Sequence, residues 1–416
     1  MDFNMLRGVL GIFVILGVAY LASSHKKSIN WRTVGGAFAI QITLAALVLY
    51  SDTGRIALEG ISAAVGSVID YSAAGIAFLF GGLGTDAMFA NGVGFVFAIR
   101  VLPVIVFFSS LIAVLYYLGI MDKIVTFLGG ALAKFLKTSD PESLSATANI
   151  FVGQTEAPLV VRPFLPTMTR SELFAVMTGG LASVAGAVLV GYAGMGIELK
   201  YLIAASFMAA PGGLLMAKFI MPEVDEPKND ISELEEPEED KKPVNVIDAA
   251  AEGASKGMML ALNVGAMLMA FVALIALLNG LIGWVGGFFG AENLTLEMIL
   301  GFVLQPVAWI LGVPWEEAFR AGSFLGQKVV VNEFVAYVDF IKYKDELSAG
   351  TQAIITFALC GFANLSSIAI LLGGLGTLAP NRRHDIAQMG MKAVFAATLA
   401  NLMSAAIAGV FISLAS

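Results

Sequence analysis

The stretch Asn149–Pro158, which reads Asn-Ile-Phe-Val-Gly-Gln-Thr-Glu-Ala-Pro, decides the fold because it has a partner near the other end of the chain. Within it, Phe-Val-Gly-Gln at residues 151–154 is followed two residues later by Glu156. Within residues 321–334, Phe-Leu-Gly-Gln at 324–327 is followed six residues later by Glu333. One short pattern therefore occurs twice, each time with a carboxylate after it.

A second pattern follows each copy at a moderate distance. Leu-Ala-Ser-Val-Ala occupies residues 181–185, and Leu-Ser-Ser-Ile-Ala occupies residues 365–369. Weak internal symmetry of glycine-interrupted apolar segments is typical of secondary transporters, whose substrate binds at the repeat interface near the middle of the membrane. The repeat therefore predicts a transporter.

The composition is that of a polytopic membrane protein. Of the 416 residues, 58% are hydrophobic and only 13% are charged, with a mean hydropathy of +0.84. These values lie far from those of soluble domains. Eight apolar runs are close to the roughly 20 residues that a helix needs to cross a bilayer. They are Met5–Leu21, Val34–Leu49, Phe95–Tyr117, Leu173–Tyr192, Tyr201–Met221, Met258–Ile282, Ala353–Leu378 and Val394–Leu414.

Several classes of function have little support in the sequence. One cysteine, Cys360, and two histidines, His25 and His384, argue against a disulfide framework and against a zinc or thiol–histidine site. The motifs HExxH and Walker A are absent, and no GxSxG has a plausible histidine partner. We expect neither an enzyme nor a nucleic-acid-binding protein.

The net charge of −8 is concentrated in one segment. Residues 223–242 contain ten acidic and three basic residues, a net charge of −7, and prolines lie within and beside them. Such composition is typical of a solvated, flexible linker between membrane helices. The rest of the chain is close to neutral.

Basic residues predict the orientation in the membrane. Lys26, Lys27 and Arg32 follow the first apolar run, and Arg382 and Arg383 precede the last. Positive charge concentrates in cytoplasmic loops. Both loops are therefore expected in the cytoplasm, which places the N- and C-termini outside. Three more polar stretches, residues 54–74, 121–137 and 294–313, are expected to lie at the interface rather than to cross.

Two segments are unsuited to a straight, lipid-facing helix. Residues 143–166 contain Gln154, Glu156, Arg162 and three prolines. They fit a re-entrant hairpin that turns at Gly153, and residues 314–340 fit a second one that turns near Gly326. Such hairpins require a protein or aqueous environment for their backbone. Each is followed by a helix interrupted by small and polar residues, at 179–185 and at 361–367.

These features predict an all-α polytopic membrane protein. It has about eight transmembrane helices, interfacial helices and two opposed re-entrant hairpins in an inverted repeat. The predicted segments are a scaffold at 1–140, hairpin 1 with two helices at 141–221, an acidic cytoplasmic linker at 222–248, a further scaffold segment at 249–313, and hairpin 2 with two helices at 314–416.

Two carboxylates carry the strongest functional signal. An ionised carboxylate within a membrane costs about 2.5 to 3.5 kcal/mol, so Glu156 and Glu333 need a reason to be there, and function is the first one. The alternative is a salt bridge with Lys328 or Arg162 that stabilises a hairpin. For Asn149, Gln154 and Asn364 the alternative is hydrogen bonding between helices. Taken alone, Val188 and Phe362 read as core residues.

Three motifs together resemble the bacterial members of the concentrative nucleoside transporter family. They are Gly-Gln-Thr-Glu-Ala-Pro at 153–158, Asn-Glu-Phe-Val-Ala-Tyr at 332–337 and Cys-Gly-Phe-Ala-Asn-Leu-Ser-Ser at 360–367. The resemblance covers nearly the whole chain. It implies a homotrimer in the bacterial cytoplasmic membrane that imports a nucleoside, such as uridine, down a cation gradient by alternating access.

The resemblance also implies the binding residues. The base is expected to meet Gln154, Thr155, Glu156, Val188 and Phe362. The ribose is expected to meet Glu333, Asn364 and Ser367. These roles suit the chemistry, because a carboxylate can accept bonds from two neighbouring hydroxyls and an amide offers both a donor and an acceptor to a base edge.

The coupling cation implied by the resemblance is Na⁺. Its ligands are expected to be the side chains of Asn149 and Ser183 and the backbone carbonyls of Val152, Ser183 and Val184. Oxygen ligands at a broken helix and a hairpin tip suit Na⁺. Asn149 favours Na⁺ over H⁺, because proton-coupled relatives tend to lack such an oxygen-rich set.

Three other functions stay open on the residues alone. A two-hairpin symporter for dicarboxylates or amino acids should present a cation to its substrate, whereas these hairpins present carboxylates. A channel does not need occluding hairpins. An intramembrane enzyme with two catalytic carboxylates would release its substrate chemically changed.

Overall fold

The computed structural model describes residues 3–85, 94–227, 243–291 and 293–415, and in these ranges every regular element is a helix. The first half contains α1 Phe3–Ala22, η1 Lys26–Ser28, α2 Trp31–Ala45, η2 Ala46–Tyr50, α3 Asp52–Asp70, α4 Ser72–Phe80, η3 Gly81–Gly84, α6 Phe97–Arg100, α7 Leu102–Tyr117, α8 Ile120–Leu136, α9 Asp140–Ala148, η4 Ala157–Phe164, α10 Arg170–Ala182, α11 Gly186–Gly194 and α12 Leu199–Ile220. The second half contains α13 Val246–Gly287, α14 Leu296–Ile310, α15 Trp315–Val330, α16 Glu333–Tyr343, η6 Lys344–Glu346, α17 Ala349–Leu359, α18 Ser367–Leu378, η7 Pro380–Arg382 and α19 Arg383–Ala415.

The all-α membrane architecture is confirmed, but one expected span is not a single long helix and one unexpected segment is long enough to cross. Eight segments of the described chain are long and apolar enough to cross a membrane, and seven of them match expected runs. The eighth is Asp52–Gly84, whose residues 54–74 were expected at the interface. Its Arg55 is paired with Asp52 in the first turn at 2.6 Å, and the apolar helix α4 extends it. The expected span Ala353–Leu378 is instead two short helices, α17 and α18.

The first hairpin begins with a strong helix start. Ser139 and Glu142 cap each other at the N-terminus of α9, with a proline in its first turn. The helix ends at Ala148, and residues 149–156 form turns before η4 begins at Ala157. The expected turn at Gly153 therefore lies within the observed one.

The second hairpin turns later than expected. Helix α15 continues through Gly326 to Val330, and the chain reverses at residues 331–332. Asn332 then caps α16, because its side chain accepts a bond from the Val335 amide at 2.9 Å. The predicted turn near Gly326 is wrong: a Cβ at Gly326 would lie 2.6 Å from Leu300 Cβ of α14. The absence of a side chain at Gly326 lets α14 pack closely against α15, and α15 continues through this residue.

Both predicted interruptions are present. Helix α10 ends at Ala182, where Ser183 takes an extended conformation and its hydroxyl donates to the Gly179 carbonyl at 3.0 Å. Helix α17 ends at Leu359, and α18 begins at Ser367. We call residues 183–185 the first break and residues 360–366 the second break.

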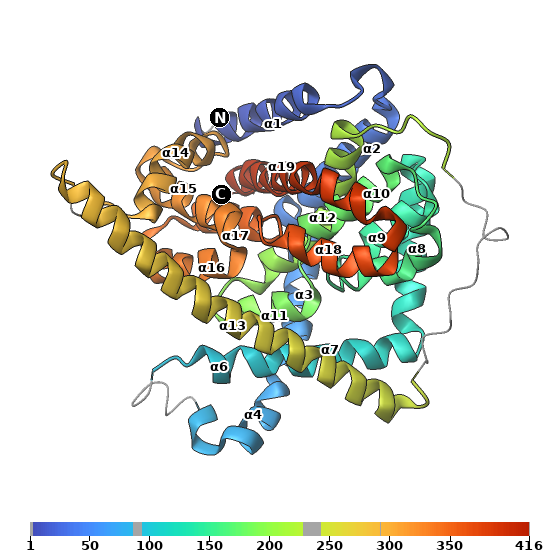
Figure 1. Ribbon diagram of the computed structural model, residues 1–416, viewed down its shortest axis with the longest axis horizontal. Coiled ribbons are helices and arrows are strands. Elements are labelled where there is room, and N and C mark those ends of the chain that lie inside the picture. Colours follow the sequence, from blue (N-terminus) through green and yellow to red (C-terminus); the bar gives the residue numbers. More distant parts are fainter. Residues whose placement is uncertain (1–2, 86–93, 228–242, 292, 416) are drawn as a thin grey trace.

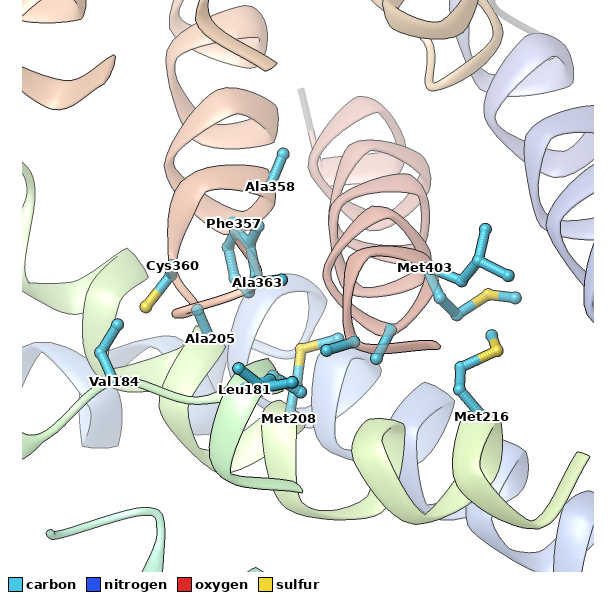
Figure 2. Close-up of a cluster of buried hydrophobic side chains, with 14 of the residues drawn as sticks. Leu181, Val184, Ala205, Met208, Met216, Phe357, Ala358, Cys360, Ala363 and Met403 are labelled. Atoms are coloured by element: carbon cyan, nitrogen blue, oxygen red, sulfur yellow. The ribbon is translucent and has the colours of Figure 1, made fainter. Parts of the chain in front are cut away.

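The two breaks meet in the core. Figure 2 shows Leu181, just before the first break, and Val184, within it, in one apolar cluster with Phe357 of α17 and with Cys360 and Ala363 of the second break. Methionine side chains of α12 and α19 lie in the same cluster (Figure 2). Non-helical backbone is thus enclosed by protein, as the apolar environment of a membrane requires.

Helix α13 runs diagonally across the view in Figure 1 and packs along α7. Gly253 and Gly257 permit this contact, since added Cβ atoms would lie 2.5 Å from Ala113 Cβ and 2.7 Å from Ser109 Cβ. A pair of glycines four residues apart lets two membrane helices approach closely. Residues 228–242 of the acidic linker before α13 lie outside the described residues.

Both basic loops lie at one end of the molecule. The amide of Ser24, in the loop after α1, bonds to the Ile220 carbonyl at the end of α12. Arg382, just before α19, donates to the Met168 carbonyl before α10. At the opposite end, Arg7 of α1 donates to the Val313 carbonyl at 3.2 Å. The two termini lie at that end (Figure 1), so the basic loops can share one side of the membrane.

Candidate substrate site

A cavity of about 470 Å³ lies where hairpin 1, the two breaks, α13 and the start of α16 meet. All eight residues predicted to contact substrate line this cavity: Gln154, Thr155, Glu156, Val188, Glu333, Phe362, Asn364 and Ser367. Small-molecule sites typically have volumes of about 300 to 1,000 Å³. Residues more than 200 positions apart in the sequence thus form one site.

Glu333 is the most tightly held of these residues. It is the first residue of α16 and is 3% exposed. The Tyr192 hydroxyl donates to Glu333 Oε1 at 3.1 Å, and Asn364 Nδ2 donates to Oε2 at 3.0 Å. A helix N-terminus also favours negative charge. Each carboxylate oxygen keeps acceptor capacity for a ligand in the cavity.

Asn364 is itself oriented by its neighbours. Its Oδ1 accepts bonds from the Ser366 hydroxyl at 2.7 Å and from the Ser367 amide at 2.9 Å. These two donors fix which end of the amide points to Glu333. The second break therefore positions the carboxylate of the second hairpin.

The expected alternative for Glu333, a salt bridge with Lys328, is not present. Lys328 Nζ donates to the Ala358 carbonyl at 2.7 Å and to Asn401 Oδ1 at 2.6 Å. No ion pair between described residues includes Lys328. Glu333 is thus held by neutral donors and stays available to a ligand.

Hairpin 1 forms another wall of the cavity. Thr155 and Glu156 are exposed to the open space, and Gln154 is 5% exposed. Glu156 Oε2 accepts a long bond from the Gly153 amide at 3.4 Å. Gln154 Oε1 is buried without a hydrogen-bond partner among the described residues. Buried amide oxygens are rarely left in this state, so a ligand is a natural partner.

The predicted cation ligands also come together at the hairpin tip. The Gly186 amide bonds to the Phe151 carbonyl at 3.0 Å, which joins the tip to the first break. Asn149 is 1% exposed and donates to the Ser145 carbonyl at 2.9 Å, while its Oδ1 has no hydrogen-bond partner in the described chain. A Cβ on Gly180 would lie 3.7 Å from that oxygen.

These residues fit a small hard cation. Val152, Ser183 and Val184 are buried, as Asn149 is, and an orphaned amide oxygen together with backbone carbonyls is the donor chemistry that Na⁺ uses at broken helices. Among the described residues no group of three or more His, Cys, Asp and Glu side chains could hold a metal ion. Any cation here depends on neutral oxygens.

Sequence analysis missed the wall formed by α13. Ser255, Lys256, Asn263 and Met267 line the same cavity, and so do Asn332 and Ser366. The spacing of Lys256, Asn263 and Met267 puts them near one face of a helix. Polar residues on one face of this apolar helix were the sequence signal that could have identified α13 as a wall of the cavity.

Models of a known family match nearly the whole chain. The model for the N-terminus of the Na⁺-dependent nucleoside transporters matches residues 10–83, and that for their C-terminus matches residues 201–409. A model described as nucleoside recognition matches residues 98–198.

Two bacterial relatives of similar length share more than half of the sequence, and a longer human relative shares less. An uncharacterized transporter of Haemophilus influenzae is 56% identical over 99% of this chain and 99% of its own. Nucleoside permease NupC of Helicobacter pylori is 53% identical over 100% of this chain and 99% of its own. Human sodium/nucleoside cotransporter 1 is 38% identical over 96% of this chain, which spans 63% of the human protein.

Solved structures share the fold. CNTnw in an inward-facing substrate-bound state is 58% identical and superimposes with a TM-score of 0.95 over 100% of this chain and 99% of its own. A CNTnw variant in an outward-facing state gives a TM-score of 0.97, with 58% identity, over 100% of both chains.

Proposed function

The chain belongs to the concentrative nucleoside transporter family, and from this premise we propose that it imports nucleosides by symport with Na⁺ through alternating access. The observation that carries the proposal is the single cavity lined by all eight predicted substrate residues. It combines a held carboxylate, amides and hydroxyls with apolar side chains, which suits a neutral solute with a flat base and a hydroxyl-rich sugar.

The ribose occupies the end of the cavity at Glu333. Two neighbouring sugar hydroxyls donate to the two carboxylate oxygens, which Tyr192 and Asn364 already hold in place. Bonds to an ionised acceptor are the stronger kind. A ligand that lacks the hydroxyls leaves Glu333 short of donors, which is the basis of selectivity for the sugar. Ser367 adds a further polar group at this end.

The base occupies the end at hairpin 1. Gln154 offers both a donor and an acceptor to a base edge, and Thr155 and Glu156 extend the polar wall. Val188 and Phe362 present an aliphatic surface and an aromatic face, between which a flat ring can lie.

Na⁺ is held by the side chains of Asn149 and Ser183 and by the carbonyls of Val152, Ser183 and Val184. The buried, unpartnered Asn149 Oδ1 supports this assignment. Because the hairpin tip bonds to the first break, a cation there orders the wall that meets the base. Na⁺ supplies the driving force, and this chain supplies neutral oxygens for it.

The transporter works as a homotrimer in the bacterial cytoplasmic membrane, with both termini outside. The scaffold at 1–140 and 249–313 stays in place, while the hairpin segments at 141–221 and 314–416 carry the site between the two faces as re-entrant hairpins. The acidic linker at 222–248 joins them in the cytoplasm. The common end occupied by both basic loops supports this orientation.

The test is uptake of labelled uridine into proteoliposomes at fixed pH, with an inward Na⁺ gradient or with choline in its place. We expect Na⁺-dependent uptake of chemically unchanged uridine and its loss in Glu333→Ala. Uptake driven only by a pH gradient would overturn the Na⁺ assignment. A modified product would indicate an enzyme, and no uptake of any nucleoside would contradict the assigned substrate.

A further inference from the structure

Lys328 is a buried cation that the binding of neither nucleoside nor Na⁺ uses. It is 2% exposed and lies near the end of α15. Both of its bonds go to neutral oxygens, those of Ala358 and Asn401. Burying an ammonium group without a carboxylate is costly, so its position needs a structural reason.

Asn401 of α19 extends this contact to both interruptions. Its Nδ2 donates to the Ala182 carbonyl at 2.7 Å and to the Cys360 carbonyl at 3.2 Å. Ala182 is the last residue of α10, and Cys360 follows the last residue of α17. Lys328 and Asn401 together, which we call the break bridge, thus contact three carbonyl groups at the C-terminal ends of two helices.

These carbonyls are the natural place for a cation. The last carbonyls of a helix lack intrahelical partners and carry the negative end of its dipole. In the first repeat, the proposed Na⁺ lies beside the first break. In the second repeat, Lys328, which directly follows Phe-Leu-Gly-Gln, donates to the Ala358 carbonyl in the last turn of α17, just before the second break. The corresponding residue after the first copy is Thr155.

The two breaks are also joined directly. The Phe362 amide of the second break donates to the Ser183 carbonyl of the first at 3.1 Å. The Leu365 amide donates to the Val329 carbonyl at 3.2 Å, which joins the second break to the end of α15 beside Lys328. Ser183 belongs to the proposed cation site, and Phe362 belongs to the proposed nucleoside site. A shift of one break is therefore transmitted to the other, provided that the break bridge keeps their spacing. The tight fit supports this: a Cβ on Gly361 would lie 2.3 Å from Asn401 Oδ1.

We propose that Lys328 and Asn401 are positioning residues that couple cation binding at the first break to nucleoside binding at the second. The inference rests on the proposed Na⁺ symport. It assigns the coupling to two buried residues that line neither site. Coupling of this kind is reciprocal and is measured as the change in affinity for one ligand caused by the other.

The experiment measures the dissociation constant of uridine for the purified full-length protein by titration calorimetry, in Na⁺ and in choline. The ratio of the two constants is the coupling factor, which is typically about 5- to 150-fold. It is measured in the parent, in Lys328→Met and in Asn401→Ala. If Lys328→Met does not fold, the coupling factor of Asn401→Ala tests the proposal.

The matched control is Ser404→Ala. Ser404 lies one turn from Asn401 on α19, accepts a buried bond from Gln41 at 2.8 Å and donates to the Ala400 carbonyl at 3.1 Å, so neither of these hydrogen bonds reaches a break. We expect a lower melting temperature in all three variants. The coupling factor should fall toward one only in Lys328→Met and Asn401→Ala.

The outcomes separate the two proposals. A parent in which Na⁺ does not change uridine affinity overturns the proposed symport and this inference with it. A coupled parent whose break-bridge variants keep the full ratio overturns this inference alone. An equal loss of the ratio in Ser404→Ala also overturns it, because any weakened core would then have the same effect.

Discussion

Glu333 lines the cavity with its carboxylate held by hydrogen bonds from two sides. It begins α16, and its two oxygens are held by residues from two other elements, Tyr192 of α11 and Asn364 of the second break. Neither partner neutralises it. The carboxylate is therefore held in position while it stays able to accept further bonds, as a preorganised binding group requires.

Tyr192→Phe tests this positioning. Bonds to charged groups contribute about 1.5 to 3 kcal/mol, so we expect the KM for uridine to rise about 10-fold or more. The KM for 2′,3′-dideoxyuridine should change less, because it does not use Glu333. Uptake kinetics with both nucleosides give the comparison.

The control is Tyr337→Phe. The Tyr337 ring is tilted against the Tyr192 ring, with their centroids 4.6 Å apart, and Tyr337 is also fully buried, but its hydroxyl donates to the Thr356 carbonyl at 2.8 Å. It should lose stability and keep its selectivity for the sugar. Equal effects of the two variants on selectivity would contradict the assigned role of Tyr192.

Asn149→Ala tests the cation site. Removing the unpartnered Oδ1 removes one proposed Na⁺ ligand, so the Na⁺ concentration for half-maximal uptake should rise several-fold. Thr147→Val is the control, since Thr147 is equally buried in the last turn of α9, just before Asn149, and its hydroxyl donates to the Ser143 carbonyl at 2.8 Å. An unchanged Na⁺ requirement in Asn149→Ala would refute this ligand.

The structure brings the predicted residues together where a motif named them. All eight expected substrate residues line one cavity. The α13 residues Lys256 and Asn263 were missed, because the packing of a scaffold helix against hairpin 1 depends on tertiary contacts that no local pattern records. Their polar character within an apolar run was visible, but their partner was not.

At the scale of elements, the two breaks border the cavity and meet in the core of the fold. A buried helix ends inside the protein at each break. The carbonyls near these helix ends accept bonds from the side-chain amide of Asn401 and from the Lys328 ammonium group, and the Phe362 amide of one break donates to the Ser183 carbonyl of the other. Irregular backbone in a membrane protein is tolerated where such partners exist. The breaks therefore need close packing as well as polar residues.

Gly361→Ala tests that packing. The new Cβ would lie 2.3 Å from Asn401 Oδ1 and 2.8 Å from the Ala182 carbonyl, so uptake should be lost and stability should fall by about 1 to 3 kcal/mol. Gly350→Ala is the control, because nothing lies within 4 Å of a Cβ there and alanine favours the helix α17. Thermal unfolding and uptake of both variants give the answer, and an active, stable Gly361→Ala would contradict this account.

The hairpin turns show the limit of glycine as a signal. Gly153 lies in the turn of hairpin 1, whereas Gly326 serves helix packing and Asn332 marks the turn of hairpin 2. Both glycines follow an aromatic and an aliphatic residue and precede glutamine. In hairpin 2 only the capping side chain of Asn332 marks the turn, because a capping residue indicates where a helix begins and a glycine alone does not.

At the scale of the whole molecule, the two ends of α12 mark opposite ends of the transporter. Its end at Ile220 meets Ser24 after α1, and its start follows Gly196, whose carbonyl accepts a bond from Lys344 at 2.9 Å. Ser28 and Asp345 are therefore at opposite ends. The positive-inside rule assigns the Ser28 end to the cytoplasm.

Cysteine labelling tests this orientation in a Cys360→Ala background. Ser28 and Asp345 are both exposed. A membrane-impermeant maleimide should label Asp345→Cys in spheroplasts and should reach Ser28→Cys only after permeabilisation. The reverse pattern would place both termini in the cytoplasm.

The most direct measurement of the central claim is the steady-state accumulation of labelled uridine in proteoliposomes with equal Na⁺ on both sides and a clamped inside-negative potential. Uridine is neutral, so potential can drive it only if a cation crosses with it. One Na⁺ per uridine predicts accumulation of up to about 50-fold at about 100 mV, and none when choline replaces Na⁺. Accumulation that ignores the potential, or that persists without Na⁺, would contradict Na⁺-coupled nucleoside transport by this protein.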